Sequence, residues 1–181
     1  MMPADFIIVR CLLTAVFCLS SVTSLGWKDG QCPCTNQSLC QPIQLGPRRE
    51  KFAFIVNTDN WRSYDYSQIT TIAMFIGDLP GEFLCFAHSK QVRLVWATGY
   101  DSRQLGNVTA REVWKQMQLE KVKSTFTDGI NIDFEHSIKN GSETALQYTS
   151  LVREVTDLLH AEVPGSQVKT ILFPCSYDQI C

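Results

Sequence analysis

Asp128-Gly129-Ile130-Asn131-Ile132-Asp133-Phe134-Glu135 is the stretch of this 181-residue sequence that decides the fold. Apolar residues alternate along it with three polar or acidic ones, Asn131, Asp133 and Glu135. An alternation with a period of two predicts a β-strand, because successive side chains of a strand point to opposite faces. Asn131, Asp133 and Glu135 would therefore form a column on one face, with neighbours about 6.6 to 6.8 Å apart.

The segments on either side of this stretch alternate between β-rich runs and helical patterns. Strands are expected at residues 51–57, 69–76, 92–97, 128–135 and 168–173. Helices are expected at residues 83–90, 109–125 and 143–162. This order predicts an α/β fold with a parallel sheet, as a doubly wound sheet or as a (β/α)8 barrel of the TIM type. The sequence has no glycine-rich phosphate loop, which weakens the nucleotide-binding versions of the fold.

The pattern of the second and third helices gives further expectations. Thr109 and Glu112 have the spacing of a capping box, so Thr109 is expected to cap the second helix. The residues of this helix expected to face the sheet are Val113, Met117 and either Leu119 or Val122. The third helix would bury a stripe made of Leu146, Thr149, Val152, Val155, Leu158 and Leu159.

The acidic column has two interpretations. If the sheet closes into a barrel, the column points to the interior, where unpaired carboxylates are costly and are usually kept for chemistry. Functional residues of such barrels lie at the carboxyl ends of the strands, and Glu135 is the last residue of its expected strand. The alternative is a half-buried strand with one face toward water. Spacing alone does not decide between the two.

Residues 1–26 have the pattern of a secretory signal peptide. Arg10 is the only basic residue near an apolar run from Phe6 to Leu19, and Ser24-Leu25-Gly26 offers a cleavage site before Trp27. The run is short for a membrane span, so we expect no membrane association after cleavage; an uncleaved anchor is the alternative. Residues 27–181 would form the folded domain.

Six cysteines remain after this segment, and six cysteines allow 15 pairings, among which the sequence does not choose. They are Cys32, Cys34, Cys40, Cys85, Cys175 and Cys181. The first three suggest a disulfide-linked N-terminal segment. Zinc is the alternative, but no histidine lies at ligand spacing and the secretory route is oxidising, so we expect disulfides and no metal.

The net charge and the glycosylation sequons indicate which partners and modifications to expect. The formal net charge of −2 gives no basic surface for nucleic acid. Asn36, Asn107 and Asn140 each begin an N-x-[ST] sequon in an expected loop or beside a helix start, so we expect N-glycans there.

Trp96, at the end of the third strand, either stacks on a sugar ring or packs in the core.

The D-G-x-[DN]-x-D-x-E pattern of residues 128–135 resembles the signature of family-18 glycoside hydrolases, the chitinase group. Residues 32–34, 63–71 and 85–90 resemble a lysosomal branch of that family, which trims the chitobiose core of asparagine-linked glycans. The resemblance implies a monomeric enzyme without a cofactor. It would hydrolyse β-1,4-linked N-acetylglucosamine oligosaccharides in the lysosome or outside the cell.

The resemblance also implies roles for individual residues. Glu135 would be the general acid, and Asp133 would orient the acetamido group of the substrate, whose oxygen is the nucleophile in this family. Asp133 beside Glu135 lets one carboxyl hold a proton while the other stays charged. Asp128 and Asn131 would complete the hydrogen-bonded column. Tyr177 resembles the tyrosine of the family's sixth strand, which contacts the acetamido group.

The length of the chain departs from the family. An eight-stranded barrel typically needs roughly 250 residues, so only about the first five strands are expected here. We therefore expect a partial barrel, and with it a truncated chain. The alternative function is an inactive isoform that acts at most as a carbohydrate-binding or regulatory fragment.

Overall fold

A computed structural model describes residues 30–46, 48–170 and 179–180. Five parallel strands form one sheet in the order β1-β2-β3-β4-β6. They are β1 (Phe52–Ile55), β2 (Thr71–Met74), β3 (Arg93–Thr98), β4 (Gly129–Ile132) and β6 (Gln167–Thr170). Each strand overlaps the run expected for it, which confirms the predicted α/β class. The end of the last expected strand, residues 171–173, lies outside the described residues, as do residues 1–26.

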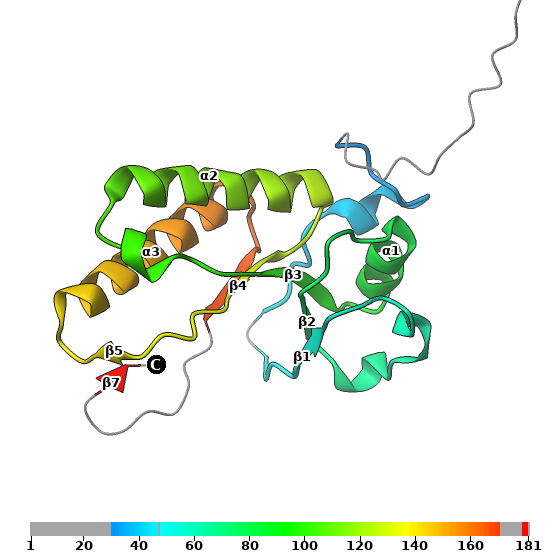
Figure 1. Cartoon of the computed structure of the whole chain (residues 1–181). Helices are drawn as coiled ribbons and strands as arrows, with labels where there is room; N and C mark the ends of the chain where they lie inside the picture. The colour runs from blue at the N-terminus through cyan, green and yellow to red at the C-terminus, as the bar shows by residue number, and fades with distance from the viewer. Residues whose placement is uncertain (1–29, 47, 171–178, 181) are drawn as a thin grey trace, which may run out of the picture.

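Three α-helices connect or follow these strands. They are α1 (Gly81–Ser89), α2 (Val108–Thr125) and α3 (Glu143–Glu162). Helices α2 and α3 lie side by side against the sheet, and α1 lies farther along it beside β3 (Figure 1). The short strands β5 (Ile138–Lys139) and β7 (Gln179–Ile180) form a separate antiparallel pair. Within the described residues, no helix is long and apolar enough to cross a membrane.

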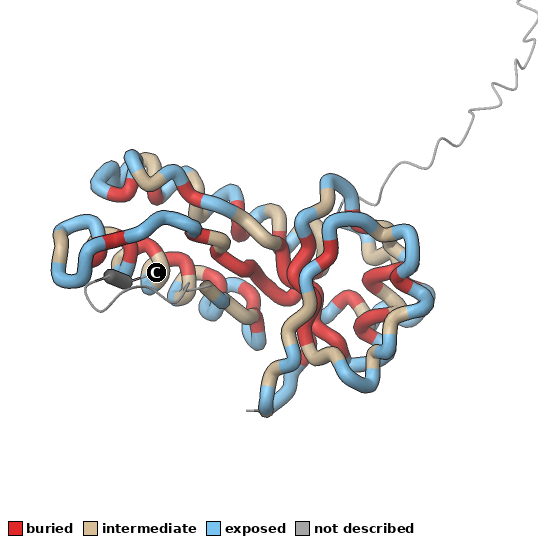
Figure 2. The backbone as a smooth tube through the Cα atoms, turned by 60° about the horizontal axis from the view of Figure 1, so that its bottom comes forward, coloured by how far each residue is buried: buried red, intermediate tan, exposed pale blue. Residues whose placement is uncertain are grey.

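The two faces of the sheet differ in what they meet. We call inner face the one on which the strand registers place Phe54, Ala73, Val95, Ala97, Asn131 and Lys169. The other face carries Ile72, Leu94, Trp96, Ile130 and Ile132, which join the helices in one hydrophobic core. Figure 2 shows buried residues concentrated along the central strands, with exposed ones on the outer turns of the helices.

The sheet is strongly curved toward its inner face. Thr71 of β2 and Gln167 of β6 both lie on this face, and the Thr71 hydroxyl donates to Gln167 Oε1 at 3.2 Å. Three strand spacings separate β2 from β6, or about 14 Å if the sheet were flat. A threonine and a glutamine side chain together cannot span that distance, so the strands curve toward the inner face, as in the wall of a barrel.

The helices differ from the sequence pattern in their details. The residue that caps α2 is Asn107, not Thr109: Asn107 Oδ1 accepts from the Ala110 amide at 3.0 Å. Val113 and Met117 are 56% and 59% exposed, so the prediction that they face the sheet is wrong, whereas Leu119 and Val122 are buried as expected.

The reason is that α2 packs on α3 as well as on the sheet. Its residue Arg111 is buried and forms an ion pair with Glu154 of α3 at 3.1 Å, which turns the side of α2 that carries Val113 and Met117 to solvent. The bounds of α3 are those expected, and Val155 and Leu159 are buried as expected. Its other buried residues, Ala145, Tyr148 and Leu151, were not in the predicted stripe. Leu146 is 65% exposed.

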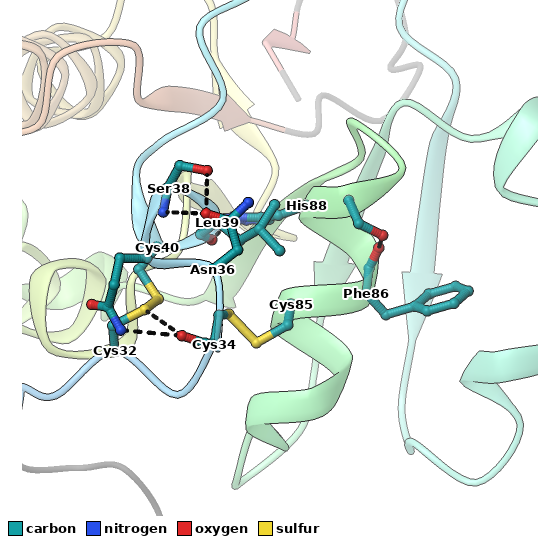
Figure 3. Close-up of a disulfide and its surroundings, with 11 residues drawn as sticks. Cys32, Cys34, Asn36, Ser38, Leu39, Cys40, Cys85, Phe86 and His88 are labelled. Atoms are coloured by element: carbon teal, nitrogen blue, oxygen red, sulfur yellow. Dashed lines mark hydrogen bonds between the residues drawn. A yellow bond between two sulfur atoms is a disulfide. The ribbon is translucent and has the colours of Figure 1, made fainter.

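Two disulfides tie the N-terminal segment to the domain. Cys32 pairs with Cys40 around the 3₁₀ turn η1 (Gln37–Cys40), and Cys34 pairs with Cys85 in α1 (Figure 3). The expected disulfides therefore form at these four cysteines. Cys175 and Cys181 lie outside the described residues. Because Cys85 and His88 are one helical turn apart, the same attachment brings Leu39 of the N-terminal segment against His88.

Asp128, directly before β4, joins this N-terminal segment to the sheet. Its fully buried carboxylate accepts hydrogen bonds from the amides of Ile43 and Leu94, each at 2.8 Å, and from His88 Nε2 at 2.9 Å. His88 Nδ1 lies 2.6 Å from the Leu39 carbonyl oxygen. Both partners of the imidazole ring are acceptors, so both ring nitrogens must donate, which fits a buried imidazolium–carboxylate pair.

Gly129 allows β6 to approach β4. Its φ of +137° is unfavourable for residues with a side chain, and an added Cβ would lie 2.0 Å from the Gln167 carbonyl oxygen. The glycine of the Asp128-Gly129 pair is therefore required by the pairing of these two strands.

We expect Gly129→Ala to lower the free energy of unfolding by about 3 kcal/mol or more, because it adds backbone strain and a steric overlap. Urea denaturation measures the effect. The control is Gly77→Ala, because nothing lies within 4 Å of the added Cβ, and its effect should stay within about 0.5 kcal/mol. Equal midpoints for the two variants would contradict this account of Gly129.

We expect the stability of the protein to fall as the pH rises above about 6.5, the ordinary pKa of histidine. Burial lowers the pKa of His88, but its hydrogen bond to Asp128 and the Asp128 charge act in the opposite direction, and the net effect raises the pKa. A raised folded-state pKa gives stability that is complete below the unfolded-state pKa and is lost as pH passes the folded-state value.

Thermal melting of wild type and His88→Gln between about pH 5 and about pH 8 tests this expectation. The wild type should lose melting temperature with rising pH, and the variant should lose less over the same range. Parallel pH dependences of the two proteins would show that His88 does not carry the effect.

Candidate functional site

The column of polar side chains begins in β4 and continues beyond it. Asn131 is the third residue of β4, lies on the inner face between Ala97 and Lys169, and is only 1% exposed. Asp133 directly follows the strand, and its amide donates to the Thr98 carbonyl oxygen at 2.8 Å. The prediction that Glu135 is the last residue of the strand is wrong, since β4 ends at Ile132.

Asp133 and Glu135 therefore lie in the loop at the carboxyl end of the parallel sheet. Asp133 is half-buried, whereas Glu135 and its neighbour His136 are exposed. Among the described residues, neither carboxylate has a hydrogen-bond or ion-pair partner. The side-chain nitrogen of Asn131 is buried and likewise has no partner. The two carboxylates are thus available to a ligand at this edge, and the Asn131 amide of the same column is a buried donor without a partner among the described residues.

Asp128 lies apart from this column, contrary to the sequence-based grouping. An even-numbered position in this strand points to the helix-covered face, and Asp128 also lies at the amino end of β4, opposite to Glu135. Its carboxylate already accepts three hydrogen bonds and is fully buried. Asp128 therefore supports the strand and does not reach a ligand at the carboxyl end.

Two other candidates have different outcomes. Tyr177 lies outside the described residues, so its role stays a prediction. Trp96 packs in the core: it is 2% exposed, its indole nitrogen donates to Thr125 Oγ1 at 2.9 Å, and the Lys121 ammonium lies 3.7 Å from the ring centroid. Burial lowers the pKa of this lysine.

An aromatic cluster beside the carboxylates was not expected from the sequence. Phe134 packs against Tyr148 of α3, with ring centroids 4.4 Å apart, and lies edge-on to His136 at 5.1 Å. The signal for Tyr148 was available, because positions 148, 151, 155 and 159 recur at helical spacing. The stripe chosen from the sequence was right at Val155 and Leu159, but at the start of the helix it took the exposed Leu146 and Thr149 and left Tyr148 out.

The three sequon asparagines are all exposed. Asn36 accepts from the Ser38 amide, Asn107 caps α2, and Asn140 lies in the turn before α3. N-glycosylation at these positions stays a prediction. The sulfurs of Cys32, Cys34 and Cys40 lie within 4.8 Å of one another, but each belongs to a disulfide, and a disulfide sulfur does not supply the thiolate that zinc requires.

Comparisons with known proteins identify relatives of this chain. No protein-family model and no solved structure matches it. A probable di-N-acetylchitobiase 2 of Dictyostelium discoideum is 42% identical over 137 residues, which cover 76% of this chain and 35% of the relative. The di-N-acetylchitobiase of Homo sapiens is 41% identical over the same shares of the two chains.

The chain thus spans little more than a third of the length of these curated relatives. A di-N-acetylchitobiase of Bos taurus is 38% identical over 136 residues, and here the match covers 75% of this chain and 77% of the relative. The chain belongs to the di-N-acetylchitobiase family.

Proposed function

We propose that the protein is a glycosidase that hydrolyses the β-1,4 bond of di-N-acetylchitobiose, the substrate that the names of its relatives indicate. The observation that carries the proposal is the pair Asp133 and Glu135, unpartnered among the described residues at the carboxyl end of β4. Active sites of parallel α/β barrels lie at this end of the sheet. The curvature recorded by the Thr71–Gln167 bond supports a barrel of the (β/α)8 type.

The proposed reaction uses one acid of the protein and one nucleophile of the substrate. Glu135, exposed in the loop, donates a proton to the glycosidic oxygen as the bond to the anomeric carbon breaks. The carbonyl oxygen of the substrate's own acetamido group attacks that carbon from the opposite face, and water then opens the cyclic intermediate. Two displacements retain the anomeric configuration.

Asp133 and Asn131 would act on the acetamido group. A carboxylate beside the amide N–H holds the carbonyl oxygen in position for attack and favours the positive charge that develops on the nitrogen. The Nδ2 atom of Asn131, which has no partner among the described residues, is a buried donor on the same face, and binding a sugar oxygen would satisfy it. Tyr177 is a further proposed contact to the same group.

The pH dependence of the His88–Asp128 pair supports a lysosomal location. The His88–Asp128 pair is complete when the imidazole is charged, so it stabilises the domain most in acidic compartments. The two disulfides fit passage through the oxidising secretory route.

We expect Glu135→Gln to reduce hydrolysis of di-N-acetylchitobiose by about 10²- to 10⁴-fold, because the amide cannot donate the proton, while the melting temperature stays unchanged. The matched control is Glu120→Gln, an exposed position on α2, which should keep wild-type turnover. Near-normal turnover by Glu135→Gln would remove Glu135 as the acid, and a wild-type protein without hydrolysis would overturn the proposed function.

We expect Asp133→Asn to slow turnover strongly as well, because the acetamido group loses its charged partner. A glucose disaccharide with the same β-1,4 bond, which has no acetamido group, should not be cleaved by the wild type. NMR of the first-formed product should show the β-anomer. Ready cleavage of the glucose disaccharide, or an inverted product, would exclude the substrate-assisted reaction.

A further inference from the structure

The loop that carries the two carboxylates has little backbone support of its own. Among the described residues, the Asp133 amide makes the last backbone hydrogen bond of this segment to the sheet. Between described residues, no backbone–backbone hydrogen bond involves residues 134–137. Within the described part of the chain, the orientation of Glu135 therefore depends on side-chain packing in this loop.

Phe134 supplies that packing, because it lies between the two carboxylates in the sequence. Its ring points to the helix-covered side, is 3% exposed and contacts the ring of Tyr148 at a centroid distance of 4.4 Å. The half-buried Asp133 and the exposed Glu135 are its two neighbours in the sequence. Holding the Phe134 ring thus fixes the backbone from which both carboxylates project.

Tyr148 is itself held at two ends. It belongs to α3 and is 5% exposed, so its ring has little freedom. Its hydroxyl is hydrogen-bonded to Thr170 Oγ1 at the carboxyl end of β6. Asp133 is near enough to affect it: burial raises the pKa of Tyr148, the Thr170 bond lowers it, and the Asp133 charge raises it. One side chain therefore connects α3, β6 and the loop after β4.

We propose that Tyr148 is a positioning residue for Asp133 and Glu135, which acts by clamping the Phe134 ring between α3 and the carboxyl end of β6. The inference rests on the proposed function, because the carboxylates that it positions are those of the proposed reaction. Tyr148 does not touch the substrate in this account. Its role is to keep the loop in one conformation, since a displacement of about 1 Å can cost about 10²-fold in rate.

Three variants separate positioning from general stability. Tyr148→Leu removes both the ring contact and the hydroxyl bond, Tyr148→Phe keeps the ring and removes only the hydroxyl, and Val155→Ala makes a cavity two turns further along the buried side of α3. For each protein we would measure the melting temperature, amide hydrogen exchange of residues 133–137, and kcat and KM on di-N-acetylchitobiose.

We expect Tyr148→Leu to speed exchange in residues 133–137 by about tenfold or more through local opening. Its kcat should fall by up to about 10²-fold with KM little changed. Tyr148→Phe should restore slow exchange and most of kcat. Val155→Ala should lower the melting temperature without changing exchange in this loop relative to the rest of the protein, and should keep wild-type kcat.

The outcomes are distinguishable from failure of the proposed function. Unchanged loop exchange in Tyr148→Leu, or a loss of kcat in Val155→Ala equal to that in Tyr148→Leu, would overturn the positioning role while wild-type hydrolysis remains. If the wild type does not hydrolyse the substrate, the proposed function fails and with it the catalytic role of Tyr148. The exchange data would still decide whether Tyr148 clamps the loop.

Discussion

The buried carboxylate of Asp128 is the interaction on which the rest of this domain depends. It receives hydrogen bonds from the N-terminal segment at Ile43, from β3 at Leu94 and from α1 at His88. A carboxylate without water must be paired and hydrogen-bonded, and here three donors from three parts of the chain meet that requirement together. Removing any one of these donors would leave the buried charge with too few hydrogen bonds. The carboxylate therefore fixes the positions of the N-terminal segment, β3 and α1 relative to one another.

The two ends of β4 therefore have different roles. The amino end of the strand is anchored by Asp128 and by the close approach of Gly129 to β6. At the carboxyl end the chain continues into a loop whose carboxylates have no partner among the described residues. Rigid support at one end and accessible polar groups at the other are what a binding loop on a sheet requires. Tyr148 and Phe134 then supply side-chain support where the backbone ladder stops.

The sequence allowed the class, the strands and the candidate carboxylates to be predicted, because period-two alternation depends only on local geometry. It did not allow the position of Asp128 to be predicted, although its even-numbered place in the strand was visible. The family signature groups it with residues of the other face, and only the contacts with Ile43 and His88 reveal its separate role. The prediction of which residues of α2 face the sheet was wrong for a different reason. A polar residue, Arg111, is buried there by its ion pair with α3, and an apolar pattern cannot anticipate a buried cation.

The disulfide between Cys34 and Cys85 has a consequence for the unfolded chain. The two cysteines are 51 residues apart, and the loop that they close contains all of β1 and β2. In the chain-entropy model, closing a loop of this size costs the unfolded ensemble about 4 kcal/mol of conformational freedom. The stability of this edge of the sheet therefore comes partly from the lower conformational entropy of the unfolded chain, in addition to the contacts in the folded protein. In a reducing compartment that restriction disappears, and β1 and β2 would depend on their packing alone.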